Sequence, residues 1–390
     1  MNVIKDAVHG NVRLSDFELA LLDTRGMQRL RRLKQVGMAN LIYPGANHTR
    51  FEHSIGTMYL AGEMAESAEL GKHDEKVLRV AALLHDVGHG AFSHESESII
   101  ARHTGKKHEE IGWERVRTGE IAELVEKEGI ALTELKNAFF GNGVGELISF
   151  DLGADRMDYL LRDSHSTGVA YGVIDYGRLI HTIKINSHKQ PVIEYGGLEA
   201  AESMLIARFL MFSSVYYHHA VRIASAMLRK ACEIAIADKS ISLKQIAEMG
   251  DEELIRALLE DKESASLARR LRERKLLKRA LQLEAFELNP TLKEKLANMR
   301  FIEKLEEEIV ETAHVSPDEL VVDFPPDYSK GETDVKILHR GKEADLRNIS
   351  EIVRAIEQAE KNRRKLIVAC PPERKEEVSN AAKKILPALT

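Results

Sequence analysis

The sequence predicts a mainly α-helical protein that ends in a smaller part of mixed helices and strands. From Asp16, apolar residues recur at helical spacing for about two hundred residues. Beyond about residue 270, short strand-like and helical segments alternate instead. The chain has 390 residues, of which 44% are hydrophobic, enough to bury the cores of two domains. We therefore predict a helical domain over residues 1–265 and an α+β module over residues 270–390.

Turn and cap residues divide the first domain. His9-Gly10-Asn11 lies between two short runs of β character and predicts a small hairpin, and Ser15-Asp16 can cap the helix that follows. A strongly apolar helix is predicted to stop at His85-Asp86, where Gly88 would bend the backbone. The other expected elements are helices over residues 54–70 and 76–84, a hairpin over 181–195, and one or two long helices over 198–237.

The order of elements in the C-terminal module suggests a ferredoxin-like fold. We expect strands over residues 281–288, 320–324, 335–338 and 366–370, and helices over 292–313, 349–360 and 373–385. This order is βαββαβ with one further helix, as in ferredoxin-like modules. The module lacks the aromatic-rich strand motifs of RNA-binding domains, so oligomer contact or support of the first domain fits it better.

Composition excludes several classes of protein. The chain has 56 basic and 62 acidic residues and a net charge of −6, which argues against nucleic acid as the main partner. No signal peptide is visible, and no run reaches the ~18 apolar residues of a membrane span, so we expect a cytoplasmic location. Cys232 and Cys370 lie far apart in apolar surroundings, which does not predict a disulfide.

Ionisable residues gather in four segments beside apolar helices. One His-Asp pair, or one buried histidine, is more often part of an ordinary core. Here the pair closes an apolar helix and further histidines follow, and no structural need explains so many buried ionisable groups. The segments are residues 50–54, 85–89, 92–94 and 151–156. We interpret them as parts of one functional site.

The ordered motifs resemble the HD superfamily. They are Arg50-Phe51-Glu52-His53, His85-Asp86-x-Gly-His-x-x-Phe-Ser-His94, and Ala154-Asp155-Arg156-x-Asp158-Tyr159-x-x-Arg162-Asp163. The chain is most similar to dNTP triphosphohydrolases of the deoxyguanosinetriphosphate triphosphohydrolase and SAM-and-HD-domain type, without a SAM domain. The resemblance covers about residues 1–230, and it implies an HD-type helical core for the first domain.

The resemblance implies a divalent metal ion and its ligands. His53, His85, Asp86 and Asp155 would bind the ion through two imidazoles and two carboxylates. Such a mixed nitrogen–oxygen site suits Zn, Mn, Fe, Ni or Mg, and the ligand types alone do not choose among them. The resemblance places His89, His94 and His108 beside the phosphates, and Glu97 is spaced to orient one of these histidines.

The resemblance also implies residues that bind the substrate. Arg50, Arg156 and Arg208 would neutralise phosphates, although many relatives have Lys at the position of Arg156. Tyr159 would lie under the sugar ring, where close packing excludes a ribose 2′-hydroxyl. Three further residues, Gln35, Asp163 and Tyr216, would approach the sugar and the base. For Tyr159, Tyr216 and Arg208, ordinary helix packing or surface charge is the alternative.

Some relatives bind a regulatory guanine nucleotide between subunits, and four residues here match those positions: Val3, Asp23, Gln28 and Arg31. The basic residue that usually precedes the first of them is Asn2 in this chain. An amphipathic helix with solvated charges explains the same residues, so both interpretations stay open. Relatives are commonly dimers or tetramers, and we expect a homo-oligomer here.

Three functions remain possible on the sequence alone. The first is hydrolysis of deoxynucleoside triphosphates to deoxynucleoside and inorganic triphosphate. The second is another HD hydrolase, acting on nucleoside monophosphates, cyclic nucleotides or guanosine tetraphosphate. The third is a nucleotide sensor without catalysis, against which the complete ligand set argues. Release of inorganic triphosphate separates the first function from the second.

Overall fold

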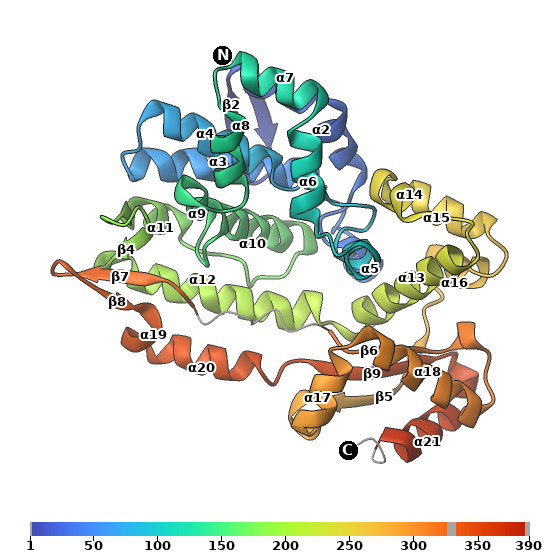
Figure 1. The fold of residues 1–390 in the computed structure, drawn as a ribbon. Coiled ribbons are helices and arrows are strands. Elements are labelled where there is room, and N and C mark those ends of the chain that lie inside the picture. Colours follow the sequence, from blue (N-terminus) through green and yellow to red (C-terminus); the bar gives the residue numbers. More distant parts are fainter. Residues whose placement is uncertain (1, 326–332, 387–390) are drawn as a thin grey trace.

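The computed structural model describes residues 2–325 and 333–386 (Figure 1). The N-terminal hairpin is confirmed: strands β1 (Asn2–Asp6) and β2 (Gly10–Leu14) pair antiparallel, with Asp6 opposite Gly10. Ser15 caps helix α1 (Asp16–Asp23) through a capping box with Glu18, as its position ahead of the apolar run predicts. The short helix α2 (Arg25–Arg29) follows, and then a 3-10 turn over Leu30–Arg32.

Three helices form the centre of the first domain. Helices α3 (Arg50–Ser67) and α4 (Lys72–Leu84) pack against each other, and α10 (Ala154–Thr167) packs against α3. Around them lie α5 (His94–Thr104), α6 (His108–Val116), α7 (Gly119–Lys127), α8 (Leu132–Phe139), α9 (Glu146–Ser149) and α11 (Tyr176–Thr182). The apolar faces of α3 and α4 are buried in one core, which leaves the polar ends of these helices to form the site.

Gly88 has a different role from the one predicted. Its φ angle is not positive, so the backbone there needs no glycine for its conformation. A Cβ atom at this position would lie 1.9 Å from the carbonyl oxygen of His108, the first residue of α6. Gly88 therefore lets the turn after α4 touch the backbone of α6.

The expected long helices over residues 198–237 are confirmed as two helices with a break. Helix α12 (Leu198–Met211) runs into a π-helical turn over Phe212–Tyr216, and α13 (His219–Ala237) continues the chain. Helices α14 (Leu243–Glu248), α15 (Asp251–Glu260) and α16 (Ala265–Arg272) pack near α13 in a second core.

The ferredoxin-like topology is wrong, although the C-terminal part is an α+β structure as predicted. Strands β5 (Lys278–Glu284), β9 (Lys365–Cys370) and β6 (Val321–Asp323) form an antiparallel sheet in the order β5-β9-β6. The third expected strand, β7 (Lys336–His339), leaves this sheet. It pairs with β8 (Lys342–Asp345) and, in parallel, with β4 (Pro191–Glu194) of the hairpin that β3 (Ile183–Ile185) begins.

The C-terminal helices complete the fold. Helices α17 (Pro290–Leu296), α18 (Met299–Ala313) and α21 (Lys375–Ile385) cover the three-stranded sheet, while α19 (Leu346–Ile349) and α20 (Glu351–Glu360) lead along α12 (Figure 1). The β4–β7 pairing and the contact of α20 with α12 bind residues 335–360 to the first domain. The boundary at residues 265–270 stays a prediction. Among the described residues, no helix is both long and apolar enough to cross a membrane.

Candidate metal centre

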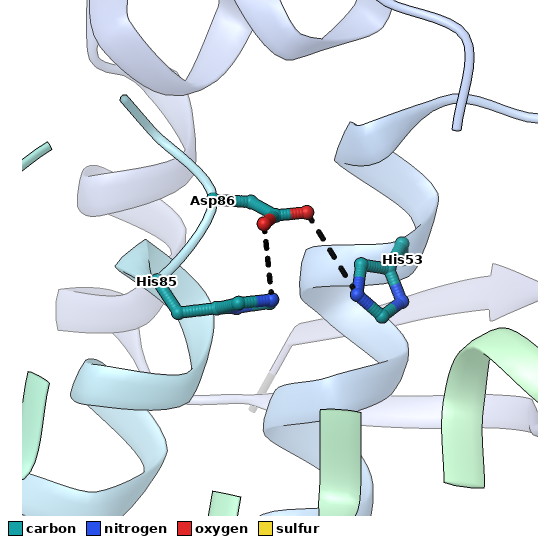
Figure 2. A group of neighbouring side chains, drawn as sticks. All are labelled: His53, His85 and Asp86. Atoms are coloured by element: carbon teal, nitrogen blue, oxygen red, sulfur yellow. Dashed lines mark ion pairs between the residues drawn. The ribbon is translucent and has the colours of Figure 1, made fainter. Parts of the chain in front are cut away.

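Three side chains offer donor atoms that all lie within 4.8 Å of one another, and a fourth, Asp155, lies beside two of them. His53 extends from the first turns of α3, His85 and Asp86 follow the end of α4, and Asp155 lies in the first turn of α10. The Nε2 atom of His53 is 3.0 Å from Oδ1 of Asp155 and 3.7 Å from Oδ2 of Asp86. The Nε2 atom of His85 is 3.3 Å from Oδ1 of Asp86 and 3.8 Å from Oδ1 of Asp155. Figure 2 shows the first three side chains pointing toward one another.

Each histidine directs its Nε2 atom toward this cluster. The Nδ1 atom of His85 lies 2.6 Å from the carbonyl oxygen of Ala82 and so donates its proton there, which leaves the buried Nε2 atom without a hydrogen-bond partner. The Nδ1 atom of His53 lies 2.7 Å from Oδ2 of Asp158, which fixes the same tautomer in that ring.

The donor set fits a divalent ion. Bonds of about 2.0–2.2 Å to nitrogen and oxygen place neighbouring ligand atoms about 3–4 Å apart, which is the spacing found between these donors. Burial lowers the pKa of His53, but hydrogen bonds to Asp155 and Asp158 outweigh it and raise the pKa to about 10. A ring proton held this firmly by carboxylates marks a place where a positive charge is stabilised, and a divalent ion would supply that charge.

A second cluster of histidines adjoins the first. The ring of His89 stacks on that of His108, with centroids 3.9 Å apart, and His89 Nε2 lies 3.2 Å from Oδ1 of Asp86. Glu97 of α5 accepts from Nδ1 of His108 at 2.5 Å and from Nδ1 of His94 at 3.3 Å. The expected group of His89, His94, His108 and Glu97 is therefore brought together.

Charges differ within this second cluster. Burial, with Arg50 and His108 nearby, lowers the pKa of His89 well below its usual value, so this ring is neutral. Burial also lowers the pKa of His108, but the hydrogen bond to Glu97 outweighs it and leaves that pKa raised. Burial raises the pKa of Glu97, yet its two histidine partners lower it overall. The cluster thus holds one neutral ring beside one charged pair.

Both clusters open into a pocket of about 290 Å³. His85, Asp86 and Asp155 line it together with His89, His94 and His108. Tyr159, Asp163 and Tyr216 line it from α10 and the π-helical turn, and Gln35, Val36 and Arg50 line it from the segments before α3 and at its start. The pocket thus joins polar, aromatic and charged groups in one concave site of the size that ligands occupy.

The family model of the HD domain matches residues 50–163, and the model of the HD-associated region matches residues 174–388. The chain belongs to the HD-domain family. An uncharacterized protein of Methanocaldococcus jannaschii is 40% identical over 293 residues, which are 74% of this chain and 62% of that protein. The SAMHD1 homolog of Dictyostelium discoideum, which is named a deoxynucleoside triphosphate triphosphohydrolase, is 28% identical over 279 residues, 64% of this chain and 51% of that protein.

A crystal structure of a hypothetical protein from Aquifex aeolicus has the same HD fold. Its TM-score is 0.80 at 27% identity, and the match covers 97% of this chain and 99% of that chain. The two curated relatives are longer, since this chain spans only 62% and 51% of their lengths. HD domains depend on a metal ion, in agreement with the donor cluster found here.

The predicted substrate residues of this HD domain separate into two groups. Arg50 lies in the pocket, where it donates to Asp86 at 2.6 Å and to the hydroxyl of Ser93 at 2.5 Å. Arg156 and Arg208 do not line the pocket but meet instead at Asp151, where Arg156 donates a hydrogen bond and Arg208 lies 3.6 Å away.

The predicted regulatory residues lie near the N-terminus of the HD-domain chain. Gln28 accepts from Nε of Arg31 at 2.9 Å, and the Arg31 guanidinium lies 3.7 Å from the centre of the Phe51 ring. Asp23 ends α1, and Val3 on β1 is 55% exposed. These contacts do not test a nucleotide site, which stays a prediction.

The sequence did not predict the residues that support the HD site, because their roles depend on contacts between segments that are distant in the chain. Asp158 accepts from His53, His9 and Arg162 in a buried network that also includes Asp6. His48 lies 2.6 Å from Asp163, which also accepts from the hydroxyl of Tyr216. Helix α10 carries three acidic residues within its first ten positions, Asp155, Asp158 and Asp163. Their spacing along the helix was a signal available in the sequence.

Proposed function

We propose that this protein is a metal-dependent phosphohydrolase that cleaves deoxynucleoside triphosphates into deoxynucleoside and inorganic triphosphate. The observation that carries the proposal is one pocket that joins the His53–Asp155 donor cluster to Tyr159, Asp163 and Gln35. The likeness to a named deoxynucleoside triphosphate triphosphohydrolase supports the choice of substrate.

A divalent ion at the donor cluster would supply an acidified water and bind a phosphoryl oxygen. Arg50 would neutralise charge on the phosphate, because its guanidinium faces Asp86 on one side and lies 3.5 Å from His94 on the other. Water adds to the α-phosphorus as the bond to the 5′-oxygen breaks. The leaving oxygen then needs one proton.

The pair of His108 and Glu97 is suited to provide that proton. The hydrogen bond to Glu97 raises the pKa of His108, which favours the protonated ring, and Glu97 holds that ring at 2.5 Å. His94 shares the same carboxylate but its side chain is 58% exposed, so it lies at the mouth of the site. We assign proton donation to His108, with His94 as the second candidate.

The sugar would lie on Tyr159. Burial raises the pKa of this phenol to about 12, so it remains neutral and can pack against a deoxyribose ring. Asp163 is held by His48 and Tyr216 and faces the same pocket, where it can accept from a 3′-hydroxyl. We also propose a homo-oligomer, in which α1, α2 and the N-terminal hairpin would contribute to a subunit contact.

The test is a product assay with each dNTP and NTP and with Mg, Mn or Ni, with and without added dGTP. The proposal predicts inorganic triphosphate and deoxynucleoside in equal amounts. Cleavage of monophosphates or cyclic nucleotides, with every triphosphate left intact, would replace it with another HD hydrolase activity. His85→Ala separates catalysis from sensing: retained nucleotide binding with lost turnover is expected.

A further inference from the structure

Two loops that are distant in the sequence form adjoining parts of the pocket wall. The first carries Gln35, Val36 and Gly37, and the second carries His89 and leads into His94. In the second loop Phe92 and Ser93 have φ angles of 56° and 52°, a region that non-glycine residues rarely adopt. Such a backbone persists only where its surroundings hold it.

Asp251, the first residue of α15, joins these two loops. One carboxylate oxygen accepts from the backbone N–H of Lys34 at 2.9 Å, and the other accepts from the backbone N–H of Phe92 at 2.7 Å. The residue is 2% exposed. It lies outside residues 50–163, the segment that the HD domain model matches.

One direct hydrogen bond also joins the loops, from the hydroxyl of Ser93 to the carbonyl oxygen of Lys34 at 3.4 Å, and the other anchors hold the second loop alone. Arg29 donates to the carbonyl oxygens of Val87 and His89, and Ala91 donates to the carbonyl oxygen of Ile246 at 3.2 Å. Each of these anchors the second loop to a neighbouring element. Asp251 differs because its two oxygens bind one loop each, at 2.9 and 2.7 Å, both shorter than the 3.4 Å contact between Ser93 and Lys34, so it helps to set the distance between Gln35 and the histidines.

We propose that Asp251 is a positioning residue that holds the Gln35 loop and the His89–His94 loop in register across the pocket. The proposal concerns the metal-independent shape of the site, and it rests on the proposed function only for its activity readout. Asp251 does not touch the donor cluster: its partners are two backbone amides.

The charge of Asp251 matters for this role. Burial raises its pKa to about 6, although the amides of Lys34 and Phe92 oppose the shift. The charged groups that face it are Lys34, Glu95 of α5 and Arg29 of α2. A carboxylate accepts well on both oxygens, whereas a neutral acid keeps one good acceptor. The two loops are therefore joined fully only above about pH 6.

The free energy of unfolding depends on pH in the opposite direction to the joining of the loops. Because the folded-state pKa is raised, the folded protein binds more protons than the unfolded chain between pH 3.8 and about 6. The contribution of this group to stability is full below that window and falls as pH rises through it. Positioning and stability thus separate, which makes the role testable apart from folding.

The experiment compares Asp251→Asn and Asp251→Ala with Glu252→Gln, an exposed neighbour on the same helix. Hydrogen exchange of peptides over residues 33–37 and 89–94 is measured in the full chain. We expect faster exchange in both peptides for the Asp251 variants, more for Ala than for Asn, and no change for Glu252→Gln. In the dNTP assay kcat/KM should fall roughly 10- to 100-fold, because Gln35 and the histidines of the two loops would be displaced although none of them is removed.

Wild-type protein gives a second readout that needs no variant. Exchange in the two peptides, relative to the rest of the chain, should rise below about pH 6 without loss of the folded state. Unchanged exchange in both peptides in Asp251→Asn, or wild-type loops insensitive to pH, would overturn the proposal. A wild-type protein that cleaves no dNTP would refute the proposed function but leave the exchange test intact.

Discussion

The Nδ1 atom of His53 lies 2.7 Å from Oδ2 of Asp158, while the Nε2 atom of the same ring lies 3.0 Å from Asp155. One imidazole therefore connects a buried carboxylate network to the donor cluster. Asp158 also accepts hydrogen bonds from Arg162 and His9, and it is fully buried. A carboxylate behind a histidine ligand fixes its tautomer and raises its basicity.

Asp158→Asn should lower metal affinity roughly 10- to 100-fold, because the charge behind His53 is lost. The control is Asp6→Asn, since Asp6 bonds the same Arg162 at 2.9 Å but does not touch His53. Both variants should lower the melting temperature, and only the first should weaken metal binding in a titration. Equal metal affinity in the two variants would show that the network serves folding alone.

Glu97→Gln should shift the alkaline limb of kcat/KM to lower pH. Glu97 raises the pKa of His108, so its loss returns that pKa toward the ordinary value and the proton donor is lost earlier as pH rises. The same sign applies to stability: the pair stabilises the fold fully below the ordinary histidine pKa and less as pH rises through the raised one.

The matched control for Glu97 is Glu109→Gln, because Oε2 of Glu109 lies 3.4 Å from the same ring nitrogen. Its longer contact predicts a smaller shift of the pH–rate profile. An alkaline limb that does not move in Glu97→Gln would remove His108 as the proton donor.

Tyr159→Ala should reduce discrimination against ribonucleotides. Removing the ring opens space where a 2′-hydroxyl would otherwise meet it, and a change of this kind alters selectivity roughly tenfold or more. Tyr159→Phe keeps the ring and should keep the discrimination. The measurement is the ratio of kcat/KM for a dNTP and the matching NTP, and an equal ratio in all three proteins contradicts the assignment.

Asp323→Ala should destabilise the protein by about 3–5 kcal/mol, because it removes the buried carboxylate that two partly buried arginines share. Asp323 on β6 is 1% exposed. It accepts hydrogen bonds from Arg222 at 2.7 Å and from Arg229 at 2.5 Å. Arg222 also lines the pocket, so binding of a dNTP should weaken as well. Denaturant unfolding checks the first effect, and Glu351→Ala, in an exposed pair with Arg354, should change little.

Local patterns predicted most elements, whereas distant pairings were not predictable. The hairpin at His9-Gly10 and the helix that ends before His85 follow from turn residues and apolar periodicity. The order of elements also suggested that β7 joins its neighbours in one sheet. Its partner is β4 from the first domain, a pairing that no local signal encodes.

The candidate site shows the same division. Short sequence motifs, with residue types that bind metals, contain His53, His85, Asp86 and Asp155. The structure brings these residues together. Asp251 belongs to no such motif, because its partners are backbone amides that any residue possesses. Supporting groups of this kind become visible only when the folded loops are placed.

Metal content of the purified protein tests the account most directly. We predict that wild-type protein and the exposed control Asp74→Ala retain one divalent ion per chain through dialysis, by elemental analysis. Asp155→Ala and His85→Ala should retain none and release no triphosphate from any dNTP while remaining folded. Asp155→Ala protein that keeps a full complement of metal and full turnover would contradict the four-ligand centre.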